Sequence, residues 1–228
     1  MVKKDNKKNE TKKDLADGIV ERLSTYLNCL VQLKDEGYKI VSSKELGKCS
    51  NVNPAEIRRD FIQFGSFGKK GVGYYIDGLI NEIQHILGAK EVFKIALVGS
   101  GNLGTAITGY EGLRKHGFHI TAVFDNSPSR IGKAIHQLVV EDTKKIKSIV
   151  KKNEIEIGII AVPEEAAQTV AEELVKAGVR VIINYTSVLI HVPDYIKVHN
   201  SNPAIELLHT LYFLSKRPSV KDTLKKKI

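Results

Sequence analysis

Apolar positions in the first ninety residues recur with helical spacing. Between Ile19 and Val31 they repeat every three or four residues, which predicts an amphipathic helix that ends near Gly37. Ser42 followed by Glu45 has the pattern of a capping box, so a short helix is expected to start near Ser43. The N-terminal third of the chain is therefore predicted to be largely helical.

A second helix start follows at once in "CSNVNPAEIRRDF". Asn53 is a candidate N-cap, Pro54 suits the first helical position, and Glu56 stands at the third. Two short helices joined by this turn predict a helix-turn-helix. The glycine-rich stretch "GSFGKKGVGYYI" then predicts a β-hairpin with Lys69 and Lys70 at its tip, which completes the pattern of a winged helix.

The pattern changes after the segment "DGLINEIQHILG", which predicts a helix capped by Asp77 and ended by Gly88. A domain boundary is expected near residues 88–92. Beyond it, near-continuous apolar runs alternate with amphipathic segments, which predicts a parallel sheet covered by helices, a Rossmann-like α/β fold. The expected strands are 94–98, 119–124, 156–161 and 180–184, and the expected helices are 102–115, 143–151 and 164–177.

The first of these strands runs into "VGSGNLG", where Gly99, Gly101 and Gly104 have G-x-G-x-x-G spacing. Between a strand and a helix, this motif lets backbone N–H groups and the helix dipole hold a pyrophosphate. Asp125 ends the next strand, where its carboxylate can accept hydrogen bonds from two ribose hydroxyls. Because that carboxylate would repel a 2′-phosphate, NAD⁺/NADH is expected rather than NADP(H), a preference that Arg130 softens.

The ends of two later strands complete the predicted cofactor site, since open α/β sheets bind ligands at the carboxyl ends of their strands. The alternative is a Rossmann-like fold whose glycine turn holds no nucleotide. The candidate cofactor residues are Gly99, Ser100, Gly101, Asn102, Leu103, Gly104, Asp125, Asn126, Arg130, Val162, Pro163, Asn184 and Tyr185.

Charge points to a polyanionic partner. The 228-residue chain has a formal net charge of +9, which favours nucleic acid. Cys29 and Cys49 lack metal-ligand spacing, so both are expected to be reduced and packed in the interior of a cytoplasmic protein without a metal site. No apolar run reaches the roughly 20 residues that a membrane span needs. The lysine-rich ends, 1–13 and 216–228, are expected to be disordered basic segments.

The candidate DNA contacts come from the predicted winged helix, whose second helix would meet base edges in the major groove. Arg58 and Arg59 are expected to project outward, where arginine suits guanine and phosphate. The alternative is a solvated face on which these arginines pair with Glu56 or Asp60. The full set of candidates is Ser42, Ser43, Asn53, Arg58, Arg59, Lys69, Lys70 and Tyr74.

No catalytic residue is predicted. A nicotinamide dehydrogenase needs a proton donor or acceptor and a substrate clamp beside the ring. None of the seven histidines stands in such a setting, and the winged helix leaves no length for a substrate domain. The dinucleotide is therefore expected to be a ligand rather than a reagent, with an NAD-dependent dehydrogenase as the alternative.

With these features in order, the chain resembles the Rex family of bacterial redox-sensing transcriptional repressors over roughly residues 15–215. The similar segments include "IRRDFIQFGSFGKKGVGY", "VGSGNLGTAITGY", "AVPEEAAQ" and "INYTS". The resemblance implies a winged-helix domain (14–90), a Rossmann NAD(H)-binding domain (91–202) and a C-terminal helix (203–215) swapped within a homodimer. It also implies a palindromic double-stranded operator, bound when NAD⁺ prevails and released by NADH, and it matches Tyr110 to a tyrosine that reports nucleotide state.

Several positions depart from that family. Asn28 stands where the family commonly has Arg, and Asn202 stands where it has Asp. In the family this Arg and Asp form a charged contact between the two domains, and both charges are missing here. "NYTS" replaces the family's "NFAP" at the nicotinamide pocket. These departures raise the alternative of a DNA-binding paralogue that holds NAD(H) structurally, with its redox response altered or lost.

Overall fold

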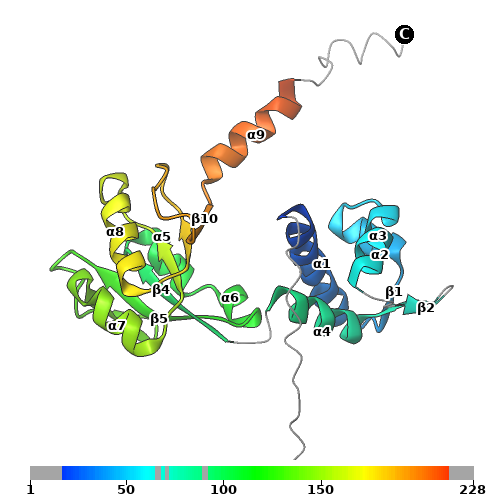
Figure 1. The fold of residues 1–228 in the computed structure, drawn as a ribbon, viewed down its shortest axis with the longest axis horizontal. Helices are drawn as coiled ribbons and strands as arrows, with labels where there is room; N and C mark the ends of the chain where they lie inside the picture. Colours follow the sequence, from blue (N-terminus) through cyan, green and yellow to red (C-terminus); the bar gives the residue numbers. More distant parts are fainter. Residues whose placement is uncertain (1–16, 65–67, 70–71, 89–91, 216–228) are drawn as a thin grey trace, which may run out of the picture. The chain divides into compact units, whose positions relative to one another are not determined.

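The computed structural model describes residues 17–64, 68–69, 72–88 and 92–215 (Figure 1). The chain divides into two compact units, Met1–Glu91 and Val92–Ile228, and each is described by itself. The two predicted basic ends and Lys70 lie outside the described residues, and only the backbone of Lys69 is described.

The described residues of the first unit contain four helices, with a shared core that includes Leu23, Leu46, Ile57 and Leu79. The predicted capping box is confirmed, because the Ser42 hydroxyl accepts from the Glu45 N–H at 3.2 Å. The predicted cap of the next helix is also present, since Asn53 Oδ1 accepts from the Ala55 N–H at 2.8 Å. These helices are α1 (Asp17–Asp35), α2 (Ser43–Ser50), α3 (Pro54–Phe64) and α4 (Ile76–Leu87).

The predicted wing is present as a small antiparallel sheet of order β1-β3-β2. Its strands are β1 (Ile40–Val41), β2 (Gly68–Lys69) and β3 (Gly73–Tyr75). The prediction that Asp77 caps the following helix is wrong. β3 runs straight into α4 at Ile76, Tyr75 takes the cap position without a side-chain bond, and Asp77 lies in the first turn.

The second unit contains a seven-stranded sheet of order β10-β9-β8-β4-β5-β7-β6 among the described residues. Neighbouring strands are parallel except for the antiparallel β6–β7 pair at one edge. The four predicted strands are confirmed, whereas the sequence pattern missed β6, β7 and β10, which are short or rich in polar residues. The strands are β4 (Phe93–Val98), β5 (Phe118–Asp125), β6 (Ala134–Ile135), β7 (Leu138–Asp142), β8 (Ile157–Ile160), β9 (Val181–Asn184) and β10 (Lys197–Asn200).

The expected helix 102–115 is wrong in one respect, because it breaks into α5 (Asn102–Thr108) and α6 (Glu111–Lys115). The His136 ring fills the space beside Gly109, and a Cβ on that glycine would lie 2.6 Å from its Nε2. The expected helix 143–151 starts as a 3₁₀ turn before α7 (Ile146–Asn153). The predicted helix 164–177 is α8 (Glu164–Ala177), and α9 (Pro203–Ser215) follows β10.

Alternate side chains of β4 face the two sides of the sheet. Val98 packs with Val150 of α7 and Leu174 of α8 on one side, and Leu97 packs with Ile159 on the other. This burial of both faces accounts for the near-continuous apolar strands. Among the described residues, no helix has the length and apolar character to cross a membrane, and no cluster of three metal-ligating side chains occurs.

Candidate dinucleotide pocket and nucleic-acid interface

The glycine turn after β4 leaves no room for a side chain at its first and third glycines. Gly99 has φ +102°, and its N–H donates to the Phe124 carbonyl at 2.8 Å. A Cβ on Gly99 would overlap the Ala161 carbonyl oxygen, and a Cβ on Gly104 would overlap the Gly99 carbonyl oxygen. The first glycine therefore serves the sharp turn, and the third allows α5 to pack against the strand end.

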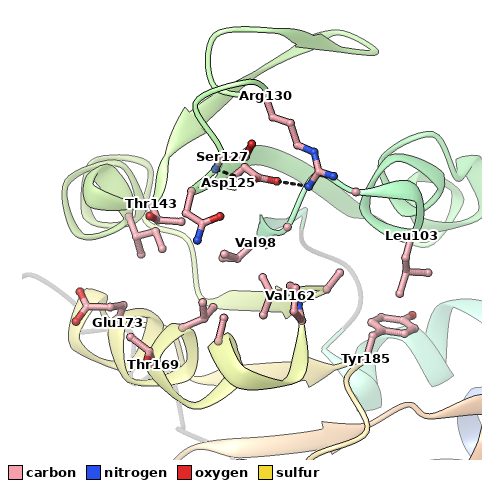
Figure 2. A pocket seen from close by; sticks show the side chains of 18 of the residues that line it. Val98, Leu103, Asp125, Ser127, Arg130, Thr143, Val162, Thr169, Glu173 and Tyr185 are labelled. Carbon is pink, nitrogen blue, oxygen red and sulfur yellow. Dashed lines mark hydrogen bonds and ion pairs between the residues drawn. The ribbon is translucent and has the colours of Figure 1, made fainter.

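This turn opens onto a cavity of about 880 Å³ at the carboxyl ends of the central strands (Figure 2). β4 pairs with β5 on one side and with β8 on the other, so the strand order reverses here. Such a reversal leaves a crevice in which open α/β sheets bind ligands. The volume lies within the roughly 300–1,000 Å³ that small-molecule sites span.

Asp125 lies at the edge of the cavity, with three donors on Oδ2 and one on Oδ1. Its Oδ2 accepts from the Ser100 N–H at 2.8 Å and from the Ser100 hydroxyl at 2.6 Å, while Oδ1 accepts from the Ser127 N–H at 2.9 Å. Arg130 Nη1 stands 3.3 Å from Oδ2. Burial alone would raise the pKa of this carboxyl, but these donors hold its pKa below the usual value.

The cavity has two chemically different ends (Figure 2). Leu103 and Tyr185 lie at one end, Thr143 and Glu173 lie at the other, and apolar residues such as Val162 line the middle. A long ligand with a polar group at each end and a charged middle near the α5 N-terminus would suit this arrangement.

The structure brings ten of the thirteen pocket candidates to the cavity: Gly99, Gly101, Asn102, Leu103, Asp125, Asn126, Arg130, Val162, Pro163 and Tyr185. Ser100, Gly104 and Asn184 do not line it. The Asn184 side chain is fully buried and donates instead to the Val188 carbonyl at 2.8 Å and to Asn200 Oδ1 at 3.0 Å. Asn184 thus holds the loop after β9 rather than facing the cavity.

Sequence reasoning missed the residues at the far end of the cavity. Thr143 follows β7, a strand that the pattern did not predict, and Thr169 and Glu173 are one helical turn apart on α8. Their spacing of four residues was a usable signal, since it places both on one helix face. Tyr110, which the family resemblance had singled out, lies outside this cavity at the break between α5 and α6 and is 65% exposed.

In the first unit, Arg58 and Arg59 are exposed on α3, as expected. Arg58 Nη1 donates to the Ser43 hydroxyl at 2.9 Å, which joins the starts of two helices into one polar surface. Three other DNA candidates have local structural partners, whereas the Lys69 side chain and Lys70 lie outside the described residues. The Ser42 hydroxyl and the Asn53 side chain cap α2 and α3, and the Tyr74 ring packs edge-on against Phe61 with centroids 5.0 Å apart.

The two acidic residues of α3 are paired with α1. Arg22 Nε and Nη2 each donate to Asp60 at 2.8 Å, and Arg22 Nη1 lies 3.6 Å from Glu56. The Tyr26 hydroxyl also donates to Asp60 at 2.8 Å. Burial would raise the pKa of Asp60, but Arg22 and Tyr26 hold it below its usual value. Both carboxylates that the solvated-face alternative assigned to Arg58 and Arg59 thus form ion pairs with Arg22.

Comparison with known proteins gives matches over both units. The family model described as a putative DNA-binding protein N-terminus matches residues 14–61. The model described as a CoA binding domain matches residues 90–188, which include the glycine turn and Asp125.

Curated relatives are similar over most of the chain. The redox-sensing transcriptional repressor Rex of Rubrobacter xylanophilus is 46% identical over 201 residues, which cover 88% of this chain and 93% of the relative. The Rex of Chloroflexus aurantiacus is 41% identical over 200 residues, which cover 88% and 94%. Rex 1 of Thermotoga maritima is 43% identical over 175 residues, which cover 76% and 84%.

Solved structures are similar in fold across both units. RSP in complex with β-NAD⁺ and operator DNA matches with a TM-score of 0.82 at 32% identity, over 94% of this chain and 97% of that one. RSP in complex with β-NADH matches with a TM-score of 0.80 at 30% identity, over 95% and 100%. RSP alone is described as a Rex-family repressor.

Proposed function

The chain belongs to the Rex family of redox-sensing transcriptional repressors, and from that membership we propose how its two units share the function. The protein is a DNA-binding transcriptional repressor that senses NADH and NAD⁺, and it is not an enzyme. The observation that carries this conclusion is the 46% identity to a named repressor over 88% of the chain. Because it acts on DNA, we place it in the cytoplasm.

The dinucleotide occupies the cavity with its pyrophosphate over the turn from Gly99 to Gly104. The backbone N–H groups at the start of α5 face that turn, and a phosphate there benefits from the positive end of the helix dipole. Asp125 binds the adenosine ribose. Its Oδ1 accepts one hydrogen bond, from the Ser127 N–H, and so keeps a lone pair for a ribose hydroxyl, whereas Oδ2 is already used by Ser100 and Arg130. A 2′-phosphate at this place would meet a charged carboxylate, which favours NAD(H) over NADP(H).

The adenine lies at the end with Thr143 and Glu173, and the nicotinamide lies at the end with Leu103 and Tyr185 (Figure 2). Val162 and Pro163 form the wall between them. Nothing in this assignment consumes the cofactor. NADH releases DNA because it has a higher affinity for the DNA-free arrangement than for the DNA-bound one.

The repressor acts as a homodimer on a palindromic operator. Support comes from α9, whose apolar side chains Ile205, Leu207, Leu208 and Leu211 are each more than half exposed. An apolar helix face of this kind is the usual mark of a protein interface. A second copy of the chain that exchanges α9 would bury it, and two winged helices related by a two-fold axis would read two half-sites.

Operator recognition lies on α3 and the wing. Arg58 is held by Ser43 and exposed, so it can turn toward a base or a phosphate, and Arg59 adds a second charge. Arg58→Ala is expected to weaken operator binding by about 1–3 kcal/mol and to relax sequence preference at one position. Lys48→Ala, on the neighbouring helix α2, is the matched charge control. Equal losses from both variants would show that Arg58 contributes only charge.

A fluorescence anisotropy titration tests the whole function. The full chain is mixed with labelled DNA fragments from its own genome, and specific binding is measured against random competitor. NADH is expected to release the bound fragment and excess NAD⁺ to oppose it. Absence of any sequence preference under all nucleotide conditions would contradict the repressor function.

A second candidate is a repressor with an altered redox response. Asn28 is exposed and uncharged, and Asn202 is buried with its Oδ1 accepting from the Ala204 N–H at 2.9 Å. Asn202 therefore caps α9, and neither residue can form the charge pair of the family. The paired substitution Asn28→Arg with Asn202→Asp is expected to sharpen release by NADH. An unchanged NADH midpoint would exclude this second candidate.

A further inference from the structure

Both cysteines of the chain lie in the first unit, on two helices that pack against each other. Cys29 is in the middle of α1, and Cys49 is near the end of α2. The two thiol groups interact with each other, and neither is in a disulfide. Twenty positions apart in sequence, they are brought together by the packing of α1 and α2.

The two thiols differ in their access to solvent. The Cys29 side chain is only 7% exposed and belongs to the apolar core of the unit. Cys49 is exposed, so the expectation that both cysteines are packed is wrong for Cys49. Burial, and after it the neighbouring Cys49, raise the pKa of the Cys29 thiol to about 12. A thiol held protonated in a core is unreactive by itself. The exposed partner meets an oxidant first.

We propose that Cys29 and Cys49 are a peroxide-oxidisable pair that closes an intramolecular disulfide between α1 and α2, a second redox input separate from the dinucleotide site. The Cys49 sulfur attacks one oxygen of hydrogen peroxide. A sulfur–oxygen bond forms, the oxygen–oxygen bond breaks, and the leaving hydroxide takes the thiol proton and departs as water. Cys49 is then a sulfenic acid.

Cys29 resolves that sulfenic acid because its sulfur is already adjacent. The sulfur–sulfur bond forms, the sulfur–oxygen bond breaks, and the leaving hydroxide takes the Cys29 proton as a second water. Two thiols lose two electrons in total, and one peroxide is reduced to two waters. A thiol reductant reverses the reaction by exchange. The bond ties the first helix of the helix-turn-helix to α1 and closes a loop that contains α2's capping box.

The test uses the full-length chain without DNA or nucleotide, so it does not depend on repressor activity. Stoichiometric hydrogen peroxide is expected to remove both free thiols, with a mass loss of two hydrogens and a linked pair of peptides that contain Cys29 and Cys49. The melting transition of the first unit is expected to rise by about 10 °C and to return after dithiothreitol. NADH affinity should stay unchanged.

Two variants separate the roles of the thiols. In Cys29→Ala, Cys49 should stop at a sulfenic acid that dimedone traps, and in Cys49→Ser, Cys29 should stay unoxidised at the same peroxide dose. The second variant changes an exposed residue, and circular dichroism checks that each variant folds. Two thiols that survive the peroxide in the wild-type chain would overturn the proposal. So would a disulfide between two chains, or a sulfinic acid at Cys49.

Discussion

Asp60 and Asp125 are two buried carboxylates with the same kinds of hydrogen-bond partner but different roles in the molecule. They are 3% and 4% exposed, each has an arginine and a hydroxyl as partners, and each has a lowered pKa. They differ in how firmly the arginine is held. Arg22 makes two bonds of 2.8 Å to Asp60 and is 27% exposed, whereas Arg130 makes one contact of 3.3 Å to Asp125 and is 51% exposed.

The difference shows what distinguishes a structural charge from one that serves a ligand. Asp60 is closed on all sides, because Arg22 and Tyr26 of α1 both reach it across the core and tie α3 to α1. Asp125 takes its remaining donors from residues beside it in the turn, and it opens onto the cavity. The first carboxylate therefore contributes to stability, and the second is free to exchange one partner for a ribose hydroxyl.

Asp60→Asn is the strongest way to test this comparison. It leaves the Arg22 guanidinium half-buried with one weak partner, and breaking a buried pair costs several kcal/mol. We expect the free energy of unfolding of the first unit to fall by about 3 kcal/mol, as measured by urea denaturation and circular dichroism. Tyr26→Phe, which removes one bond and keeps the packing, should cost about 1 kcal/mol. Equal stability of Asp60→Asn and wild type would refute the structural role.

Asp125→Asn should lower the affinity for NADH more than it lowers stability. The amide oxygen still accepts from one side of the turn, but the amide NH2 group faces an N–H donor on the other side, so the free energy of unfolding is expected to fall by about 1–2 kcal/mol, less than for Asp60→Asn. The bond between a carboxylate and the ribose is lost, and NADH affinity should fall about tenfold or more in isothermal titration. If the free energy of unfolding falls together with the NADH affinity, and by as much as in Asp60→Asn, then Asp125 contributes to stability in the same way as Asp60. The proposed difference between the two carboxylates would then be wrong.

The two regions also differ in how far the sequence predicted them. Capping is local, so Ser42 with Glu45 and Asn53 with Pro54 were enough to predict α2 and α3. The glycine turn was predicted for the same reason, because all three glycines that it needs lie within six consecutive residues of the sequence.

Contacts between distant residues were not predictable in this way. Arg22 and Asp60 are 38 positions apart, and the pattern suggested partners for Asp60 on its own helix instead. Thr143 reached the cavity through β7, a strand of five residues with two acids at its end. The ring that lies against Gly109, at the break between α5 and α6, belongs to His136 in the β6–β7 turn. Each of these features involves contacts between residues that are far apart in the sequence, and a short stretch of sequence does not contain that information.

Acid pH should affect the two carboxylates in the same direction and to different extents. A lowered pKa contributes stability that is present above the unfolded value, near 3.9 for Asp, and is lost as pH falls through the folded pKa. The stability gap between wild type and Asp60→Asn should therefore stay constant from about pH 7 to pH 5 and narrow below about pH 4. Urea midpoints at four pH values measure it. A gap that narrows already between pH 7 and 5 would contradict an ionised Asp60.

Arg130→Gln should have the smallest effect, because the half-exposed Arg130 makes a single 3.3 Å contact and Asp125 keeps its three donors from Ser100 and Ser127 without it. Unfolding should be unchanged within about 0.5 kcal/mol. The informative measurement is selectivity. In the wild-type protein, Arg130 is a cation that can attract a 2′-phosphate placed beside Asp125, and the variant lacks this cation. NADPH affinity should fall by up to about fivefold while NADH affinity barely changes. Equal losses of NADH and NADPH affinity would mean that Arg130 holds Asp125 in place for the ribose. The pair of Arg130 and Asp125 would then resemble the structural pair of Arg22 and Asp60.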